Sequence, residues 1–79
     1  MKILFFSHLR NVTGQAEVGL TVNEPVNADT LWQKLTILYP ELGRYRCIVR
    51  LARNWEYVGS ETQFSDADEV ALIPPVSGG

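Results

Sequence analysis

The stretch 68-DEVALIPP-75 predicts a strand with a defined end. Because side chains alternate between the two faces of a strand, Val70 and Leu72 share one face and Ala71 and Ile73 share the other. The strand is therefore apolar on both faces, as strands at the centre of a sheet are. The two prolines that close the stretch lack an N–H for further pairing and stiffen the exit toward polyproline II. We expect a central strand that ends at the prolines and leads into an extended tail.

The start of the chain has the same character. Residues 2–7 are rich in Ile and Phe, with Ile3 and Phe5 on one face and Leu4 and Phe6 on the other. We expect the first and last strands to lie side by side at the centre of the sheet, because both are apolar on both faces.

One amphipathic helix is expected between the strands. Asn27 is a good N-cap, because its short side-chain oxygen can accept a hydrogen bond from a free amide of the first turn. From residue 28 onward, Leu31, Leu35 and Leu38 recur at helical spacing and form an apolar stripe. Pro40 ends the helix because it cannot continue the hydrogen-bond ladder.

The remaining segments alternate strands with turns, and the first two strands form a hairpin. Their residue patterns predict strands at 17–22, 46–52, 56–58 and 69–73, and turns at 11–14, 54–55 and 65–68. One helix needs one sheet face to cover it, so this order predicts an α+β domain over residues 1–75. The arrangement is that of the ubiquitin-like β-grasp, a mixed sheet of about five strands packed on one main helix.

Composition is that of a globular protein. The 79 residues are 46% hydrophobic and 20% charged, and the chain is short enough for a single domain. The longest apolar run, residues 3–6, is far shorter than the ~20 residues that span a bilayer and too short for a signal peptide. We therefore expect a cytoplasmic protein with no membrane partner. A net charge of −2 argues against nucleic acid as a partner.

Charge is unevenly distributed along the chain. Four arginines cluster in the middle, and after the last of them every Asp, Glu, Lys or Arg is acidic. Either the acids lie in solvated loops, or they steer an acidic end toward a basic partner surface, and both interpretations stay open. The arginines are Arg44, Arg46, Arg50 and Arg53, and the acids are Glu56, Glu61, Asp66, Asp68 and Glu69.

Two potentially reactive side chains are expected to be structural. Cys47 is the only cysteine, so the chain has no internal disulfide and no CxxC metal motif. In a strand, such a residue is most often a small buried hydrophobe. A nucleophilic role would need a basic neighbour, such as Arg46 or Arg50, to stabilise the thiolate. We expect His8 to be a surface residue and not a catalyst.

The sheet face away from the helix should also be apolar. Leu4 and Phe6 on the first strand and Ala71 and Ile73 on the last would form a contiguous patch there, with Tyr57 as a further contributor. A contiguous exposed apolar patch usually marks an interaction site. The alternative is that the loop after the fourth strand folds over this face.

The tail closes with two glycines, Gly78 and Gly79. Glycines have no side chain to clash, so such a tail can thread into the active site of another protein and bring its carboxylate close to a nucleotide. The sequence contains no P-loop, so an ATP-using partner would have to activate that carboxylate. The alternative is a merely disordered Gly-rich tail, although Pro74 and Pro75 stiffen its start.

Several motifs together resemble the small subunit of molybdopterin synthase, a β-grasp sulfur carrier. The segment from Asp68 to Gly79, ending in Pro-Pro-Val-Ser-Gly-Gly, looks like the C-terminal signature of that family. The resemblance covers nearly the whole chain. Supporting matches are 3-ILFFS-7 followed by Leu9-Arg10, Leu31-Trp32, Tyr39-Pro40-Glu41-Leu42 and Glu56-Tyr57-Val58.

The resemblance implies a role for the flexible tail, residues 76–79. An E1-like enzyme would use ATP and Mg²⁺ to adenylate the carboxylate of Gly79, and a sulfur donor protein would convert the acyl-adenylate into a thiocarboxylate. Gly78 would be the spacer that allows threading. The tail would then insert into the large subunit of the synthase, where its sulfur passes to cyclic pyranopterin monophosphate and builds the dithiolene of molybdopterin.

The resemblance also implies how the partner docks. This chain would be the sulfur-donating, non-catalytic subunit of a heterotetramer, would bind no metal or cofactor itself, and would leave the catalytic side chains mainly to the large subunit. Its partner-binding residues would be Phe6, Tyr57, Ile73, Pro74, Pro75 and Val76.

Three other functions remain open from the sequence. A sulfur carrier of the thiamin pathway shares the fold and the two glycines. A ubiquitin-like modifier would form an isopeptide bond to lysines instead of a thiocarboxylate. A plain binding module would use only the apolar face, and removing Gly79 would leave its function intact.

Overall fold

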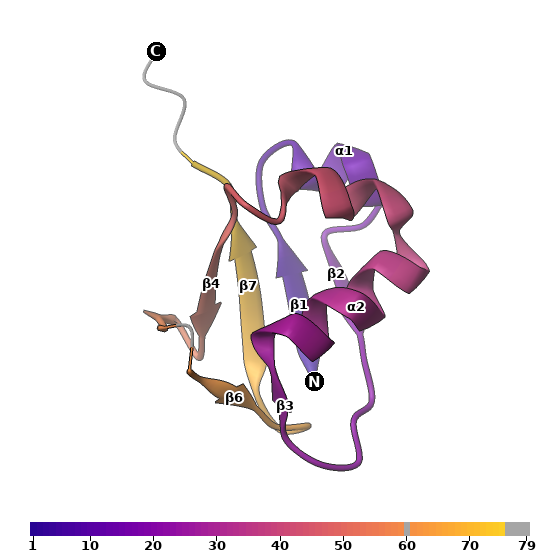
Figure 1. The fold of residues 1–79 in the computed structure, drawn as a ribbon. Helices are drawn as coiled ribbons and strands as arrows, with labels where there is room; N and C mark the ends of the chain where they lie inside the picture. The colour runs from indigo at the N-terminus through magenta and orange to yellow at the C-terminus, as the bar shows by residue number, and fades with distance from the viewer. Residues whose placement is uncertain (60, 76–79) are drawn as a thin grey trace.

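The computed structural model describes residues 1–59 and 61–75, so the predictions made for Val76, Gly78 and Gly79 lie outside the described residues. Figure 1 shows a sheet with helices on one face. The elements in chain order are β1 (Lys2–Phe5), α1 (Leu9–Thr13), β2 (Glu17–Gly19), β3 (Val26–Asn27), α2 (Ala28–Leu38), the 3₁₀ helix η1 (Pro40–Tyr45), β4 (Arg50–Arg53), β5 (Glu56–Tyr57), β6 (Gln63–Phe64) and β7 (Glu69–Ile73).

The first and last strands form the centre of the main sheet, as predicted. The strand order is β2-β1-β7-β4-β5, and β7 lies between β1 and β4 (Figure 1). β1 and β7 run parallel, while the other neighbours are antiparallel, so the sheet is mixed. Lys2 is paired with Glu69 at one end of the central pair and Phe5 with Leu72 at the other.

The core lies between this sheet and α2. Ile3 and Phe5 from β1 and Val70 and Leu72 from β7 are fully or almost fully buried, as their common face predicts. They form one cluster with the apolar side chains of the helix, including Leu31. The α+β class and the β-grasp arrangement are therefore confirmed.

The predicted start of α2 is confirmed, but the predicted end of its apolar stripe is wrong. The Thr30 N–H donates to Oδ1 of Asn27 at 2.9 Å, which is the predicted N-cap. Leu38, however, is 49% exposed, and Trp32 is buried instead. The 3₁₀ helix η1 packs against α2 and buries its own Leu42, and the buried stripe of α2 ends at Leu35, one turn earlier than predicted.

The segment predicted as a turn over residues 11–14 is the second half of the short helix α1. Gly14 caps it with a φ of 74°, and its N–H donates to the Arg10 carbonyl at 2.8 Å. β1 and β2 are therefore an antiparallel pair joined through a helix.

The third strand begins later than predicted. Residues 46–48 form a turn, and β4 starts at Arg50, which pairs with Ile73. Ile73 is followed by Pro74, which has no N–H to donate. The hydrogen-bond ladder between β4 and β7 therefore cannot extend beyond this pair. Cys47 lies in the turn and is exposed, so the expectation of a buried hydrophobe at this position is wrong.

A second, two-stranded sheet was not predicted. Val26 of β3 pairs with Phe64 of β6, and Asn27 with Gln63, beside the start of α2. Phe64 is fully buried in the main core. The segment after β5, which could instead have folded over the outer sheet face, therefore contributes Phe64 to the core.

Asp66 ties the start of the chain to the turn before β7. Its Oδ1 accepts hydrogen bonds from the Val22 N–H at 3.0 Å and from the Met1 ammonium at 3.2 Å. These contacts hold the pKa of Asp66 below its usual value. The hydrogen bond from the Val22 amide has the largest effect, and the Met1 ammonium adds to it. The Met1 ammonium also donates to the Leu20 carbonyl at 2.8 Å.

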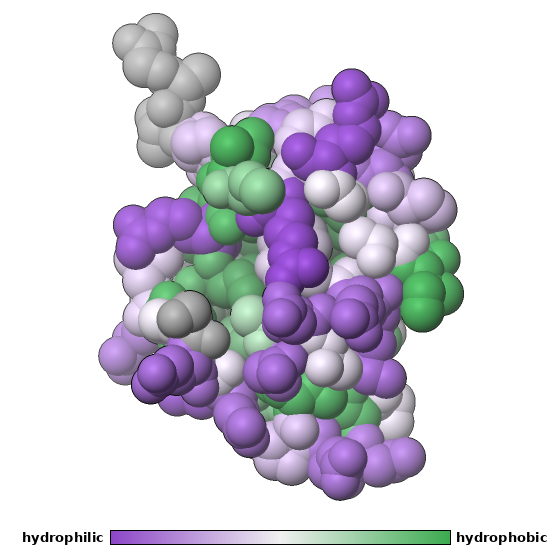
Figure 2. Space-filling view, viewed as in Figure 1, coloured by the Kyte–Doolittle hydropathy of each residue, from purple (hydrophilic) through white to green (hydrophobic). Residues whose placement is uncertain are grey.

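The side that carries α2 is largely polar. Figure 2 shows this side, where hydrophilic residues dominate and apolar residues form separate patches. Ile37 on α2 is the most exposed of the large apolar residues described, at 79%. In the described part of the chain, no helix is both long and apolar enough to span a bilayer.

Candidate functional site

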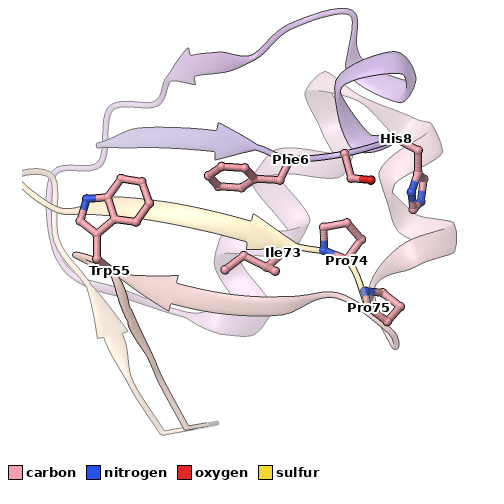
Figure 3. A pocket seen from close by; sticks show the side chains of 7 residues that line it. Phe6, His8, Trp55, Ile73, Pro74 and Pro75 are labelled. Atoms are coloured by element: carbon pink, nitrogen blue, oxygen red, sulfur yellow. The ribbon is translucent and has the colours of Figure 1, made fainter. Parts of the chain in front are cut away.

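An apolar pocket of about 650 Å³ lies where β1 and β7 end. Figure 3 views it from the sheet face away from α2 and shows Phe6, Ile73 and Trp55 on that face, with the two prolines beside them. The face follows from the strand period, because Phe5 and Leu72 point into the core and their successors point away. The lining residues are Phe6, Ser7, His8, Trp55, Ile73, Pro74 and Pro75.

A row of four side chains crosses the outer face of the sheet beside the pocket. The strand register places Leu4, Ala71, Ala52 and Tyr57 in one row across the outer face of the sheet. Ala52 and Ala71 are each only 3% exposed, although α2 lies on the other face. The expectation of an open patch that includes Ala71 is therefore wrong, whereas Tyr57 in the same row is 56% exposed.

Trp55 also lies on this outer face. Its ring lies 6.4 Å from the Phe6 ring, centroid to centroid, in an edge-to-face arrangement. Phe6 follows β1 and Trp55 lies in the turn between β4 and β5, so a contact between them crosses β7, which lies between β1 and β4. The Trp55 side chain still remains 69% exposed. One side of its ring is packed, and most of its surface is free.

A tight turn holds Trp55 in this place. Arg53 pairs with Glu56, which leaves Asn54 and Trp55 as a two-residue loop, with φ values of 51° and 72°. Positive φ at both central residues is the geometry of a type I′ hairpin turn. The Asn54 N–H donates to the Glu69 carbonyl at 2.7 Å, and the Glu69 N–H donates back to Asn54 Oδ1 at 3.0 Å. The turn is thereby tied to the first residue of β7.

Cationic groups border the pocket. The Arg10 guanidinium lies 6.0 Å from the Phe6 ring centre and donates through Nε to the Phe5 carbonyl at 3.2 Å. On the other side, Arg50 lies 4.1 Å from the Tyr57 ring centre, a close cation–π contact. The His8 ring lies 5.2 Å from the Tyr45 ring of η1, centroid to centroid, at an interplanar angle of 57°.

The arginines of the middle of the chain and the acidic residues that follow them have different places in the structure. Arg50 pairs with Ile73 at the pocket end of the sheet, whereas Glu69 starts β7 at the opposite end, 3.6 Å from Lys2 Nζ. The three other arginines of the cluster seen in the sequence each have a different partner. Arg44 pairs with Glu41, Arg46 pairs with Asp29, and Arg53 donates to the Gln63 carbonyl. Arg10 and Arg50 thus lie beside residues of the pocket, and Glu69 lies at the opposite end of β7.

Four of the six predicted partner-binding residues meet at the pocket: Phe6, Ile73, Pro74 and Pro75. Tyr57 does not line it. Its side chain is 56% exposed and contacts Arg50. Val76, like Gly78 and Gly79, lies outside the described residues. His8 is exposed, as expected, and lines the pocket.

Trp55 is the residue that sequence reasoning missed. The sequence pattern predicts a turn at this position, and the signal that could have found the residue is a large aromatic side chain where a two-residue hairpin turn favours glycine. Within residues 1–59 and 61–75, no three His, Cys, Asp or Glu side chains gather closely enough to hold a metal ion.

Comparisons with known proteins agree with this architecture. The model of the ThiS family matches residues 3–79. The molybdopterin synthase sulfur carrier subunit of Arabidopsis thaliana is 33% identical, over all of this chain and 82% of that protein. The human protein of the same name is 30% identical, over all of this chain and 93% of that protein. Among solved structures, SAMP1 from Haloferax volcanii superposes with a TM-score of 0.85 at 28% identity, over all of this chain and 98% of that one.

Proposed function

Since this chain belongs to the ThiS family, we propose that it is the sulfur-carrying small subunit of molybdopterin synthase and acts in molybdenum cofactor biosynthesis. The observation that carries the proposal is the position of the apolar pocket, whose wall is formed by the two prolines that lead into the Gly-Gly tail. A partner that docks on the pocket is placed where it can receive the tail. The names of the relatives with 30% and 33% identity support the same role.

The large subunit of the synthase is the partner that docks there. Phe6 and Ile73 supply apolar contact area, and Pro74 is buried at the pocket wall, so the direction in which the chain leaves the sheet is set by packed residues. Proline adds stiffness to that exit, which lowers the entropy lost when the tail is threaded. Val76 continues the apolar contact, and Gly78 and Gly79 enter the active site of the partner.

The chemistry takes place at the carboxylate of Gly79. In the first step, an E1-like enzyme with ATP and Mg²⁺ forms the acyl-adenylate and releases pyrophosphate. A sulfur donor protein then displaces AMP, which leaves a thiocarboxylate. In the synthase, two loaded carrier chains each pass one sulfur to cyclic pyranopterin monophosphate, which builds the two-sulfur dithiolene of molybdopterin. The carboxylate of each Gly79 is regenerated with an oxygen from water. We place these steps in the cytoplasm.

The test is the intact mass of the protein purified from its own host. A thiocarboxylate species, heavier by one oxygen-to-sulfur exchange and mapped to the peptide that ends at Gly79, is the expected result. Its absence, even after incubation with ATP, the E1-like enzyme and the sulfur donor, would contradict the proposal. A variant without Gly79 is the control and should never gain the mass.

A second candidate is a ubiquitin-like protein modifier. The likeness to SAMP1, a small archaeal modifier protein by name, favours it. The same tail would then form an isopeptide bond with a lysine of a target protein. Mass spectrometry of higher-mass adducts from the host separates the two, because a Gly-Gly remnant on lysine after digestion indicates conjugation and a thiocarboxylate indicates sulfur transfer.

A further inference from the structure

Backbone strain in this protein gathers around the pocket. Three non-glycine residues in the described part of the chain have positive φ, namely Ser7, Asn54 and Trp55. Ser7 and Trp55 line the pocket from opposite sides, and Asn54 is the partner of Trp55 in its turn. Strained residues persist where the surrounding structure holds them, and they cluster at functional sites.

Trp55 is the most informative of the three. The second central position of a type I′ turn strongly favours glycine, because a side chain there is close to the backbone. Asn54 tolerates this region, but a tryptophan at a φ of 72° is an unusual choice. Burial does not account for it, since the side chain is 69% exposed. Folding alone would be served as well by glycine at this position.

The rim of the pocket has a matching feature. Arg10 and Arg50 border the apolar surface next to Phe6 and Tyr57. Neither guanidinium forms an ion pair with a carboxylate within residues 1–59 and 61–75. An apolar centre with cations on two sides fits a partner surface that presents an apolar side chain flanked by carboxylates.

We propose that Trp55 determines partner specificity: with Phe6 and Ile73 it binds an apolar side chain of the synthase large subunit, whose neighbouring carboxylates pair with Arg10 and Arg50. This inference rests on the proposed function and adds to it the residue that selects the partner. A partly packed tryptophan that lines an apolar pocket is of the residue type most enriched among interface hot spots.

The experiment measures the dissociation constant for the purified large subunit of the same organism, together with the melting temperature of each carrier variant. Trp55→Gly should weaken binding tenfold or more and leave the melting temperature unchanged or raised, because glycine relieves the positive φ. Trp55→Asn, which also tolerates this φ, should weaken binding in the same way. Ile37→Ala on α2 is the control with a similarly exposed apolar side chain and should bind like the wild type. The wild-type affinity should fall as ionic strength rises, and less steeply in Arg50→Gln.

Three outcomes would overturn the inference. Equal affinity of both Trp55 variants and the wild type would show that the ring does not contact the partner. A clear fall in melting temperature in both variants, with no fall in affinity beyond the unfolded fraction, would assign Trp55 to folding. If the wild type neither binds the large subunit nor forms a thiocarboxylate, the proposed function fails as well. If it does both and only the Trp55 effect is missing, the proposed function stands and this inference alone is wrong.

Discussion

The two tryptophans lie on opposite sides of the same sheet. Trp32 on α2 is 4% exposed and belongs to the core cluster, whereas Trp55 on the outer face is 69% exposed and has a positive φ. Trp32 therefore contributes mainly to stability, and its position follows the helical stripe. Trp55 occupies a position where folding favours another residue. The comparison teaches that the helix-covered face is packed for stability, whereas the outer face keeps apolar side chains exposed, as the proposed docking of a partner requires.

The largest expected effect tests the core face. Phe5→Ala removes a ring that is 1% exposed and packs edge-to-face on Tyr39 at 5.6 Å. The variant should lose about 3–5 kcal/mol of the free energy of unfolding, measured by urea titration. A loss below about 1 kcal/mol would contradict the assignment of this face to the core.

Phe6, the residue after Phe5, is expected to affect partner binding more than stability. Phe6→Ala on the outer face should cost only about 1 kcal/mol of stability, because its side chain is half-buried. The same change should weaken binding to the large subunit by about tenfold or more, as loss of an interface anchor does. Calorimetric titration with folded variant protein checks this. Strong unfolding of Phe6→Ala with unchanged affinity would reverse the proposed roles of the two faces.

The turn that holds Trp55 gives a smaller effect. Asn54→Ala removes the hydrogen bonds to the Glu69 N–H and Asp68 Oδ1 and places alanine at a φ of 51°, so it should cost about 2 kcal/mol. Asn54→Gly removes the same bonds without the strain and should recover about 1 kcal/mol of that loss. Thermal melts of both variants compare them. Equal stability of the two would show that the positive φ carries no strain.

The smallest effect concerns the pH dependence of stability. Because the folded-state pKa of Asp66 is lowered by the Val22 amide and the Met1 ammonium, its ionised form contributes stability above its ordinary pKa of about 4. That contribution is lost as the pH falls through the lowered value. Asp66→Asn should therefore melt slightly below the wild type at neutral pH, and the difference should vanish in acid. A difference that persists in strong acid would assign the effect to packing.

Much of the fold and part of the site could be predicted from the sequence. The strand at 69–73, the N-cap at Asn27 and the outward positions of Phe6 and Ile73 follow from local patterns, and the structure confirms them. The start of β4 could not be predicted, because the register opposite β7 and Pro74 sets it. The apolar appearance of Cys47-Ile48-Val49 suggested a strand where the chain turns. Roles for Gly78 and Gly79 stay predictions.

The local sequence pattern was sufficient to predict those features of the fold that have a local physical cause. Alternation of apolar residues and the missing N–H of proline determine strand faces and strand ends without reference to the rest of the chain. Only the tertiary structure decided which residues complete the site. Trp55 and Phe6 meet on the outer face because the strand order puts only β7 between β1 and β4, from whose ends the two residues extend. Contacts between distant segments depend on register and packing, which no short stretch of sequence contains.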